Sequence, residues 1–122
     1  MGDPRHALGL AAEDAVAAWL TAAGWRVIRR RTRSAGGGEV DLVAIDPART
    51  LVAVEVRARR TPRAGAAAMS VDGRRVARLG RTLAAIGATC GEPHGGLRID
   101  LVSAEPTGDP GRWRLTRVPG IG

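Results

Sequence analysis

The sequence predicts an α/β protein whose elements follow the order α-β-β-β-α-β, with one added strand at the C-terminus. Two segments, around residues 4–23 and 76–86, place apolar side chains at helical spacing. Two aliphatic runs, residues 39–46 and 51–59, surround an Asp-Pro turn, as a β-hairpin requires. One basic strand precedes this hairpin, and two further strands follow the second helix.

The first helix is expected to begin at Asp3-Pro4, because Asp is a favoured N-cap and Pro suits the first helical turn. Gly24 is expected to end it. Its apolar face is predicted to carry Leu8, Ala12, Ala15, Trp19 and Ala23. The next segment, residues 25–33, reads as a strand with a basic end, and residues 34–38 form a glycine-rich loop without the Gly-Lys-Ser/Thr ending of a P-loop. The glycines of this loop indicate mobility or a close backbone approach.

The second half of the chain supplies the remaining elements. Residues 60–68 are predicted to form a flexible connection to the second helix. The apolar face of that helix carries Val76, Leu79, Leu83 and Ile86. Strands are expected at 97–103 and 112–118, separated by a short Pro/Gly loop.

The chain length and the lack of a long linker or an internal repeat predict one domain over residues 1–122. Its core is expected at about 4–103, followed by a C-terminal extension at 104–122. No apolar run approaches the ~18 residues of a membrane span, and no signal segment is recognised at the start. We therefore expect a soluble, cytoplasmic protein with no membrane partner. The single cysteine excludes an internal disulfide.

The charge of the chain points to a polyanionic partner. The sequence has 19 Lys and Arg against 12 Asp and Glu, a net charge of +7, and all 19 are Arg. Such an excess on a small domain favours nucleic-acid binding, and the guanidinium fork can donate two hydrogen bonds to one phosphate. The alternative is a compositional bias toward Arg and Ala that implies no partner. Only three Trp and no Phe or Tyr are present, which argues against a stacking platform for single-stranded bases.

The hairpin carries acidic residues where a core strand should be apolar. A symmetric hairpin closed by residues 46–50 would pair Ile45 with Leu51, Val43 with Ala53, Asp41 with Glu55, and Glu39 with Arg57. These side chains would share one face of the sheet, since strand side chains alternate with period two. The opposite face, predicted to pack on a helix, would carry Val40, Leu42, Ala44, Val52, Val54 and Val56.

Asp41 and Glu55 would then be like charges about 5 Å apart. At an effective dielectric constant near 20 they would repel by about 3 kcal/mol. A shared proton, a neighbouring Arg, or a divalent cation such as Mg²⁺, which prefers carboxylate oxygens, could compensate. Two alternatives remain open: the strand ends carry ordinary cross-strand ion pairs such as Glu39 with Arg57, or a one-residue slip of register puts Asp41 and Glu55 on opposite faces.

Several short motifs occur together in a specific order: "AAEDAVAAWLTAAGW", "GEVDLVAID", "VAVEVRAR", "SVDGRRVARL" and "LRIDLVS". In this combination the chain resembles the YraN-type uncharacterised protein family, which is related to the PD-(D/E)xK nuclease superfamily. The resemblance covers about residues 8–103. It implies a restriction-endonuclease-like fold, in which helices flank a mixed sheet, and a metal site built on Asp41 and Glu55 and completed by the backbone carbonyl of Val56. Glu13 matches an acidic position that resolvase-like relatives place near the metal.

One departure from the family pattern concerns the basic residues. The pattern ends in Glu-x-Lys, whereas this chain has Glu55-Val56-Arg57, and a later family lysine is matched by Arg75. Arg keeps the positive charge and the hydrogen bonds of Lys, but it cannot act as a general base.

The resemblance and the charge together predict a nucleic-acid-binding protein, with DNA favoured, that acts as a metal-dependent endonuclease on phosphodiester bonds. Mg²⁺ or Mn²⁺ would be held by Asp41 and Glu55, and Arg57 would stabilise charge in the transition state. Glu39 or Glu13 could orient the water or a second metal. Candidate phosphate contacts are Arg30, Arg31, Arg33, Arg74, Arg75, Arg78 and Arg81, for which an ordinary solvated surface is the alternative.

Two competing functions remain open: a non-catalytic DNA-binding protein that retains the nuclease scaffold, and a protein-interaction module whose positive charge is incidental. The oligomeric state is not predicted by any motif, and a homodimer is one possibility because small nuclease-like domains often grip a duplex as pairs.

Overall fold

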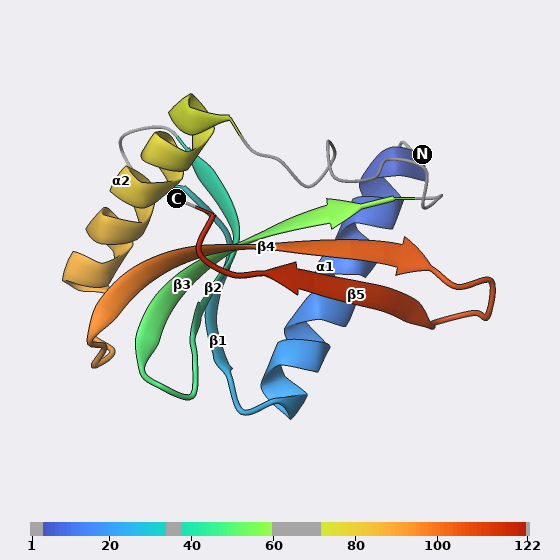
Figure 1. The fold of residues 1–122 in the computed structure, drawn as a ribbon, viewed down its shortest axis with the longest axis horizontal. Helices are drawn as coiled ribbons and strands as arrows, with labels where there is room; N and C mark the ends of the chain where they lie inside the picture. The colour runs from blue at the N-terminus through green and yellow to red at the C-terminus, as the bar shows by residue number, and fades with distance from the viewer. Residues whose placement is uncertain (1–3, 34–37, 60–71, 122) are drawn as a thin grey trace.

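The structure is a computed structural model that describes residues 4–33, 38–59 and 72–121 (Figure 1). Its elements are α1 (Pro4–Ala22), β1 (Arg26–Arg33), β2 (Glu39–Ile45), β3 (Thr50–Ala58), α2 (Gly73–Thr89), β4 (Gly96–Pro106) and β5 (Trp113–Val118). This is the predicted α-β-β-β-α-β order with an added C-terminal strand, so the fold class is confirmed. The connection predicted at 60–68 and residues 34–37 of the predicted loop lie outside the described residues.

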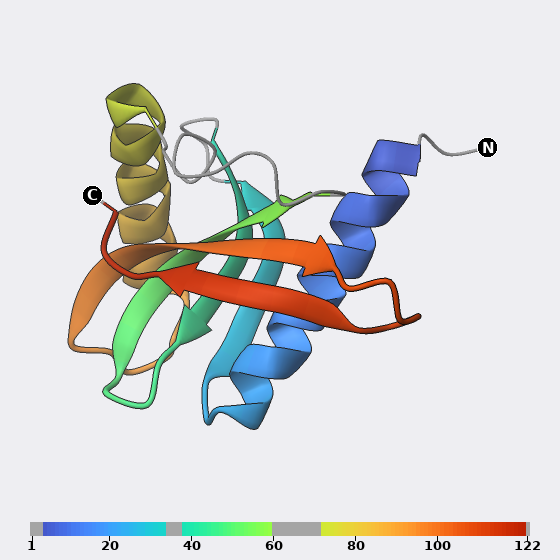
Figure 2. The ribbon, with the colours of Figure 1, turned by 45° about the vertical axis from the view of Figure 1, so that its right-hand side comes forward.

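The five strands form one mixed sheet in the order β1-β2-β3-β4-β5. β3 and β4 pair in parallel, whereas the other neighbours are antiparallel. The chain crosses over between the two parallel strands through the segment that contains α2. Figure 2 shows the two helices separated by the sheet, so that the elements form three layers.

The β2–β3 hairpin has the predicted register: Ile45 pairs with Leu51 and Val43 with Ala53. Asp46 builds the turn, because its Oδ1 accepts hydrogen bonds from the backbone N–H groups of Ala48 and Thr50 at 2.9 and 2.8 Å. Such Asx contacts replace backbone pairing in a tight turn. The turn chemistry and the alternation of side chains therefore fix the same register.

Each face of the sheet buries its own apolar core. On the α1 face the core consists of Ala12, Val16, Leu20, Trp25, Leu42, Ala44, Val52, Val54, Val102 and Ala104. On the α2 face it consists of Val40, Val43, Ile45, Leu51, Ala53, Leu79, Leu83, Ile86 and Ile99. The central strands are thus buried on both sides, as expected for strands covered by two helix layers.

The apolar face predicted for the hairpin is wrong for Val40, which packs with the α2 core rather than beside Leu42. The β2–β3 ladder ends at the pair of Leu42 with Val54, and Val40 pairs with Thr32 of β1. Beyond Leu42, β2 pairs with β1 and no longer with β3. The side-chain alternation expected for the hairpin therefore does not determine where Val40 packs.

The predicted apolar face of α1 is also partly wrong. Ala12, Val16 and Leu20 are buried, whereas Trp19 is 39% exposed. An Ala-rich helix offers two adjacent rows with four-residue spacing, and the row with the larger aliphatic side chains is the one that packs on the sheet. Gly24 ends the helix as predicted: its φ is +90°, and the next N–H, of Trp25, bonds back to the Leu20 carbonyl at 3.0 Å.

A buried polar cluster lies at the hairpin-turn end of the α1 face. Asp100, which is fully buried, accepts hydrogen bonds from the guanidinium groups of Arg98 and Arg117 and from a backbone N–H. Both guanidinium groups also lie over the ring of Trp25, at 5.8 and 5.1 Å from its centroid. Arg98 also donates a hydrogen bond from Nη1 to Asp46 Oδ2 at 2.9 Å. The carboxylate of Asp100 is therefore fully paired, and the cluster links β4 and β5 to the hairpin turn.

None of the helices in the described ranges is long and apolar enough to cross a membrane.

Candidate active site

Asp41 and Glu55 meet where β2 and β3 stop pairing. Beyond the last ladder pair, the Asp41 carboxylate takes the place of a backbone acceptor: its Oδ2 accepts a hydrogen bond from the backbone N–H of Val56 at 2.8 Å. The same carboxyl group lies close enough to the Glu55 side chain to raise the pKa of the Glu55 carboxyl group. The structure therefore brings together the two acidic residues on which the predicted site depends.

Glu55 is 4% exposed, and burial raises the pKa of its carboxyl group to about 8, with the Asp41 carboxyl adding to the shift. Desolvation disfavours the charged form, and a nearby like charge acts in the same direction. At neutral pH the pair therefore holds a proton. This proton is one of the three forms of compensation that the sequence leaves open.

Arg75 supplies the second form of compensation. One of its terminal guanidinium nitrogens donates to both oxygens of Glu55, at 3.1 and 3.2 Å. Arg75 lies in the first turn of α2, where its backbone N–H donates to the N-cap Asp72 at 2.9 Å. The helix start is thus anchored by Asp72, and this anchoring directs Arg75 toward the carboxylate pair.

Glu13 reaches the same region from α1. Burial raises its pKa, the Asp41 carboxylate raises it further, and the nearby guanidinium groups of Arg31 and Arg30 oppose the shift. Arg31 Nε lies 3.2 Å from Glu13 Oε1. This oxygen is buried and has no hydrogen-bond partner among the described residues, so the contact is an ion pair by distance but lacks hydrogen-bond geometry.

Arg31 adopts an uncommon backbone conformation. Its φ is +47°, in the left-handed region that non-Gly residues rarely occupy. Within a strand such a residue redirects the side chain, and strained residues of this kind cluster at functional sites. The contact between Arg31 and Glu13 lies on the α1 side of the carboxylate pair.

The remaining predicted site residues lie around this centre. Glu39 accepts two hydrogen bonds from Arg33 of β1, at 3.2 and 3.1 Å. Its ion-pair partner is therefore Arg33, whereas the symmetric hairpin predicts Arg57. Arg57 follows Glu55 by two residues on β3 and pairs with Ser103 of β4. Among the described residues, no group of three or more His, Cys, Asp and Glu is placed to hold a metal, so Glu13 and Glu39 do not join Asp41 and Glu55 in one such group.

The donor set at this centre fits a divalent cation. The carboxyl groups of Asp41 and Glu55 lie close together, and the pKa of Glu55 is raised to about 8. A divalent cation would relieve the repulsion between the two groups in their charged forms. Mg²⁺ is commonly bound by one or two carboxylates, with water completing the shell. Asp41 and Glu55 would supply these ligands. Val56 lies beside them and donates its N–H to Asp41.

The seven arginines predicted to contact phosphate differ in their surroundings. Arg30, Arg31 and Arg33 of β1 form ion pairs with Asp14, Glu13 and Glu39, respectively. Arg75 is paired with Glu55. Arg74, Arg78 and Arg81 are exposed on α2, and no ion pair joins them to any described residue.

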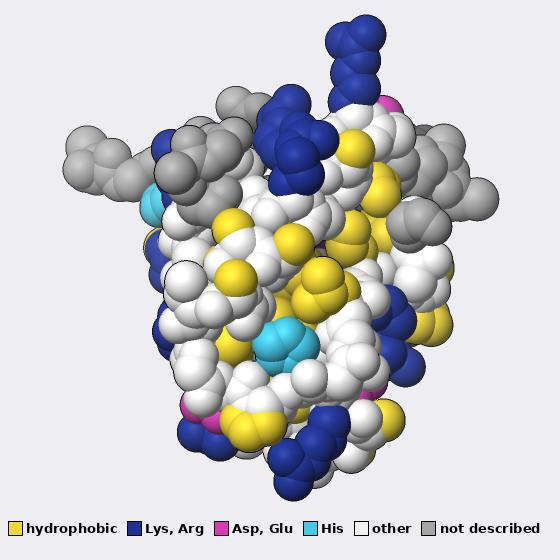
Figure 3. Space-filling model, turned by 90° about the vertical axis from the view of Figure 1, so that its left-hand side faces the viewer, with side chains coloured by type: hydrophobic (Ala, Val, Ile, Leu, Met, Phe, Trp, Pro, Cys, Tyr) yellow, Lys and Arg dark blue, Asp and Glu magenta, His cyan; other side chains and the backbone are white. Residues whose placement is uncertain are grey.

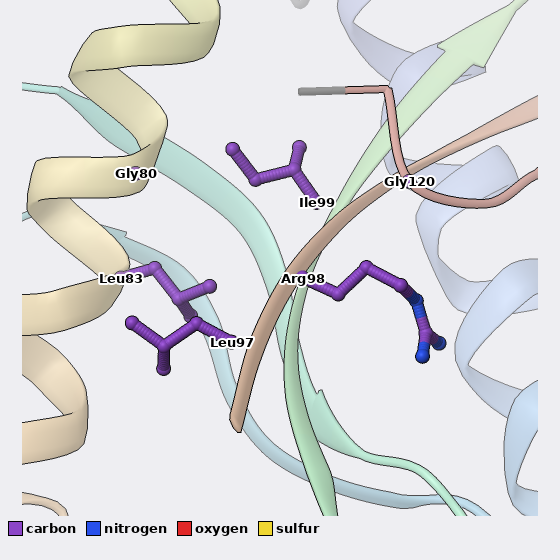
Figure 4. Close-up of a pocket in the computed structure, with 6 residues that line it drawn as sticks. All are labelled: Gly80, Leu83, Leu97, Arg98, Ile99 and Gly120. Carbon is purple, nitrogen blue, oxygen red and sulfur yellow. The ribbon is translucent and has the colours of Figure 1, made fainter.

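A separate cavity lies between α2 and β4 (Figure 4). It has a volume of about 300 Å³ and is lined by Gly80, Leu83, Leu97, Arg98, Ile99 and Gly120. Its lining is mainly apolar and contains neither Asp41 nor Glu55. This cavity is therefore distinct from the carboxylate pair.

Sequence reasoning missed two features of this region and left a third open. Asp72 as the N-cap could have been found, because it precedes the apolar row of α2 by a few residues. The strained Arg31 gives no signal in the sequence. Gly38 carries a weak signal, since a loop glycine permits either mobility or a close approach. A Cβ on Gly38 would lie 3.0 Å from Arg78 Cγ and from Thr82 Oγ1, so the close approach is the observed reason.

A mixed sheet lies between two helices, and the order of elements is that of a nuclease-like core. Together with the carboxyl groups of Asp41 and Glu55 on the central hairpin, these features define a class of α/β proteins with a nuclease-like core. Residues 12–104 match the model of a family described as "Uncharacterised protein family UPF0102", and the chain belongs to this family. The predicted membership of the YraN-type family is thereby confirmed.

Relatives cover most of the chain. A UPF0102 protein of Deinococcus radiodurans is 40% identical over 113 residues, which are 92% of this chain and 91% of the relative. One from Symbiobacterium thermophilum is 40% identical over 111 residues, 91% of this chain and 92% of the relative. One from Anaeromyxobacter dehalogenans is 37% identical over 122 residues, 97% of this chain and 85% of the relative.

Proposed function

We propose that this protein is a metal-dependent nuclease that hydrolyses phosphodiester bonds of nucleic acid, with DNA as the favoured substrate. The observation that supports the proposal is the contact between the buried Glu55 and the half-buried Asp41 at the point where their strands separate. Burying the Glu55 carboxyl group beside a second carboxyl group is unfavourable unless the two are compensated. A site for a divalent cation gives a functional reason for keeping them.

In this proposal Asp41 and Glu55 would hold Mg²⁺ or Mn²⁺, and Glu55 would serve as a ligand in its deprotonated form. A divalent cation at such a site supplies Lewis-acid stabilisation of a phosphodiester oxygen and lowers the pKa of a coordinated water. Glu13 lies near enough to Asp41 for the Asp41 carboxylate to raise its pKa. Its buried Oε1 has no hydrogen-bond partner in the described part of the chain, so Glu13 could accept a hydrogen bond from a water molecule and orient it.

Two arginines can stabilise charge that develops on the phosphate. Arg57 follows Glu55 at the position of the family lysine, and Arg75 already binds Glu55. A guanidinium group keeps its charge at all physiological pH values and can donate two hydrogen bonds to one phosphate. Neither residue acts as a general base, so we assign to both electrostatic stabilisation of the transition state.

A non-catalytic nucleic-acid-binding protein is the second candidate. The observation that favours it is the replacement of lysine by Arg57 and Arg75, which removes any side chain able to exchange a proton at those positions. Both candidates predict DNA binding that weakens with salt. Cleavage of the substrate distinguishes them.

The test is incubation of the protein with duplex, nicked, single-stranded and branched DNA in the presence of Mg²⁺ or Mn²⁺. The matched variants are D41N and D14N, which remove the same charge. Asp14 is exposed on α1 and pairs only with Arg30 among the described residues. The proposal predicts that D41N loses about 100-fold or more in rate, because a metal contributes several kcal/mol to the transition state, and that D14N cleaves as the wild type does. Equal inertness of the wild type and D41N on all four substrates would reject the nuclease proposal.

A further inference from the structure

We infer that the phosphodiester backbone of the nucleic acid runs along α2, over Arg74, Arg78 and Arg81, and that the β1 arginines serve mainly to pair the protein's own acidic residues. This inference rests on the proposed function, because it describes the route by which the nucleic-acid substrate would reach Asp41 and Glu55. From charge alone, the arginines of α2 and those of β1 would be expected to bind phosphate equally well. The inference separates them into a set that binds phosphate and a set that does not.

The first set, which we call the α2 ridge, consists of Arg74, Arg78 and Arg81. These residues are spaced by four and three positions, so their side chains project from one side of the helix. All three are exposed, and none forms an ion pair with another residue in the described ranges. Three positive charges that no described carboxylate pairs are therefore available to phosphates.

The view onto the α2 side of the molecule shows the same distribution (Figure 3). Basic side chains project from the upper end of this side, and others lie along its edges and at its lower end, whereas the middle of the view is mainly apolar and uncharged.

The α2 ridge adjoins the carboxylate pair. Arg75, which binds Glu55, is the immediate neighbour of Arg74 and lies one helical turn before Arg78. Arg78 packs its aliphatic stem on Gly38, where an added Cβ would lie 3.0 Å from its Cγ. Gly38 directly precedes β2, the strand that carries Asp41. A nucleic-acid backbone bound along the α2 ridge would therefore pass close to Arg75 and the carboxyl groups of Asp41 and Glu55.

The β1 set is neutralised within the protein. Arg30 pairs with Asp14 and Arg31 with Glu13, both on α1, while Arg33 pairs with Glu39. A phosphate that bound these arginines would have to displace a carboxylate and leave it unpaired. The first two pairs also lie on the α1 side of the sheet, opposite the α2 ridge, because α1 and α2 pack on different faces.

The test compares two triple variants that remove the same charge, R74Q/R78Q/R81Q and R30Q/R31Q/R33Q. Binding of a fluorescently labelled DNA duplex is followed by anisotropy in EDTA at several salt concentrations. A third variant, R74K/R78K/R81K, keeps the charge of the α2 ridge and shows whether substitution alone disturbs the helix. Circular dichroism and thermal unfolding confirm that each variant is folded.

The slope of log K against log salt falls by about 0.9 for each lost phosphate contact. The α2 triple Gln variant is therefore expected to lose about 2.7 in slope and to bind roughly two orders of magnitude more weakly at about 0.1 M salt. The Lys variant should retain most of the slope, and the β1 triple variant should lose less than about 1.

Equal losses of slope in the two Gln variants, or a larger loss in the β1 variant, would overturn the inference while leaving nucleic-acid binding intact. If the wild type itself showed no salt-dependent binding of DNA, the proposed function would fail and the inference with it. The two failures are thus distinguished in one set of titrations.

Discussion

Replacing Asp41 by Asn should change how stability depends on pH. The folded-state pKa of Glu55 is raised from 4.5 to about 8, so between these values the folded protein holds a proton that the unfolded chain releases. Stability therefore falls as pH rises through this window. The amide introduced by D41N keeps an oxygen that can accept from the Val56 N–H, but it removes the charge that opposes ionisation of Glu55.

The size of the effect follows from the shift. A difference of about 3.5 pKa units, at about 1.4 kcal/mol per unit, corresponds to about 5 kcal/mol between pH 4.5 and pH 8. Two charges about 5 Å apart contribute roughly 3 kcal/mol of this at an effective dielectric constant near 20. Burial, the largest cause of the shift, persists in D41N. Over the same pH range, the free energy of unfolding of D41N should therefore fall by about 2 to 3 kcal/mol less than that of the wild type.

The assay is urea unfolding of the wild type, D41N and D14N in EDTA at several pH values from about 5 to 9, bracketing the raised pKa. Because D14N removes a charge from an exposed position, it should follow the wild type, and effects of other titrating groups cancel in the comparison. Parallel pH profiles for the wild type and D41N would refute the reasoning, since they would show that Asp41 does not oppose ionisation of Glu55.

Two further predictions concern the surroundings of the site. G38A should lower the free energy of unfolding by about 1 to 3 kcal/mol, because its Cβ would overlap Arg78 and Thr82; urea unfolding measures this, and an unchanged midpoint would contradict the close approach. D100A should destabilise by about 3 to 5 kcal/mol, because it removes the carboxylate that Arg98 and Arg117 share and leaves Arg98 with Asp46 alone. A loss below about 1 kcal/mol in calorimetry would show that the cluster contributes little.

The hairpin could be predicted from the sequence because its signals are local. An Asp-Pro turn between two aliphatic runs specifies the register, and the observed pairs of Ile45 with Leu51 and Val43 with Ala53 agree with it. That register alone places Asp41 near Glu55. The same rule fails at Val40, because the ladder to β3 ends at the pair of Leu42 with Val54, two pairs short of Val40.

The partners of the charged residues could not be predicted, because they come from elements far apart in the sequence. The hairpin pattern predicts that Glu39 pairs with Arg57, but Glu39 pairs with Arg33, which depends on how β1 lies beside β2. The sequence identifies Arg75 as a basic residue of the site, but its contact with Glu55 requires the crossover that brings α2 over the sheet. The prediction for the apolar face of α1 fails for a related reason: in an Ala-rich helix, tertiary packing selects between two similar faces.

The central claim is that Asp41 and Glu55 together bind one divalent cation, and calorimetric titration of Mn²⁺ tests it most directly. At pH 7 a carboxyl group with a pKa of about 8 is about nine-tenths protonated, so binding should release about one proton per ion. Repeating the titration in buffers with different ionisation enthalpies counts this proton. The account predicts one Mn²⁺ per chain with about one proton released, and loss of both binding and release in D41N. Undiminished Mn²⁺ binding in D41N, or binding to the wild type without release of a proton, would contradict it.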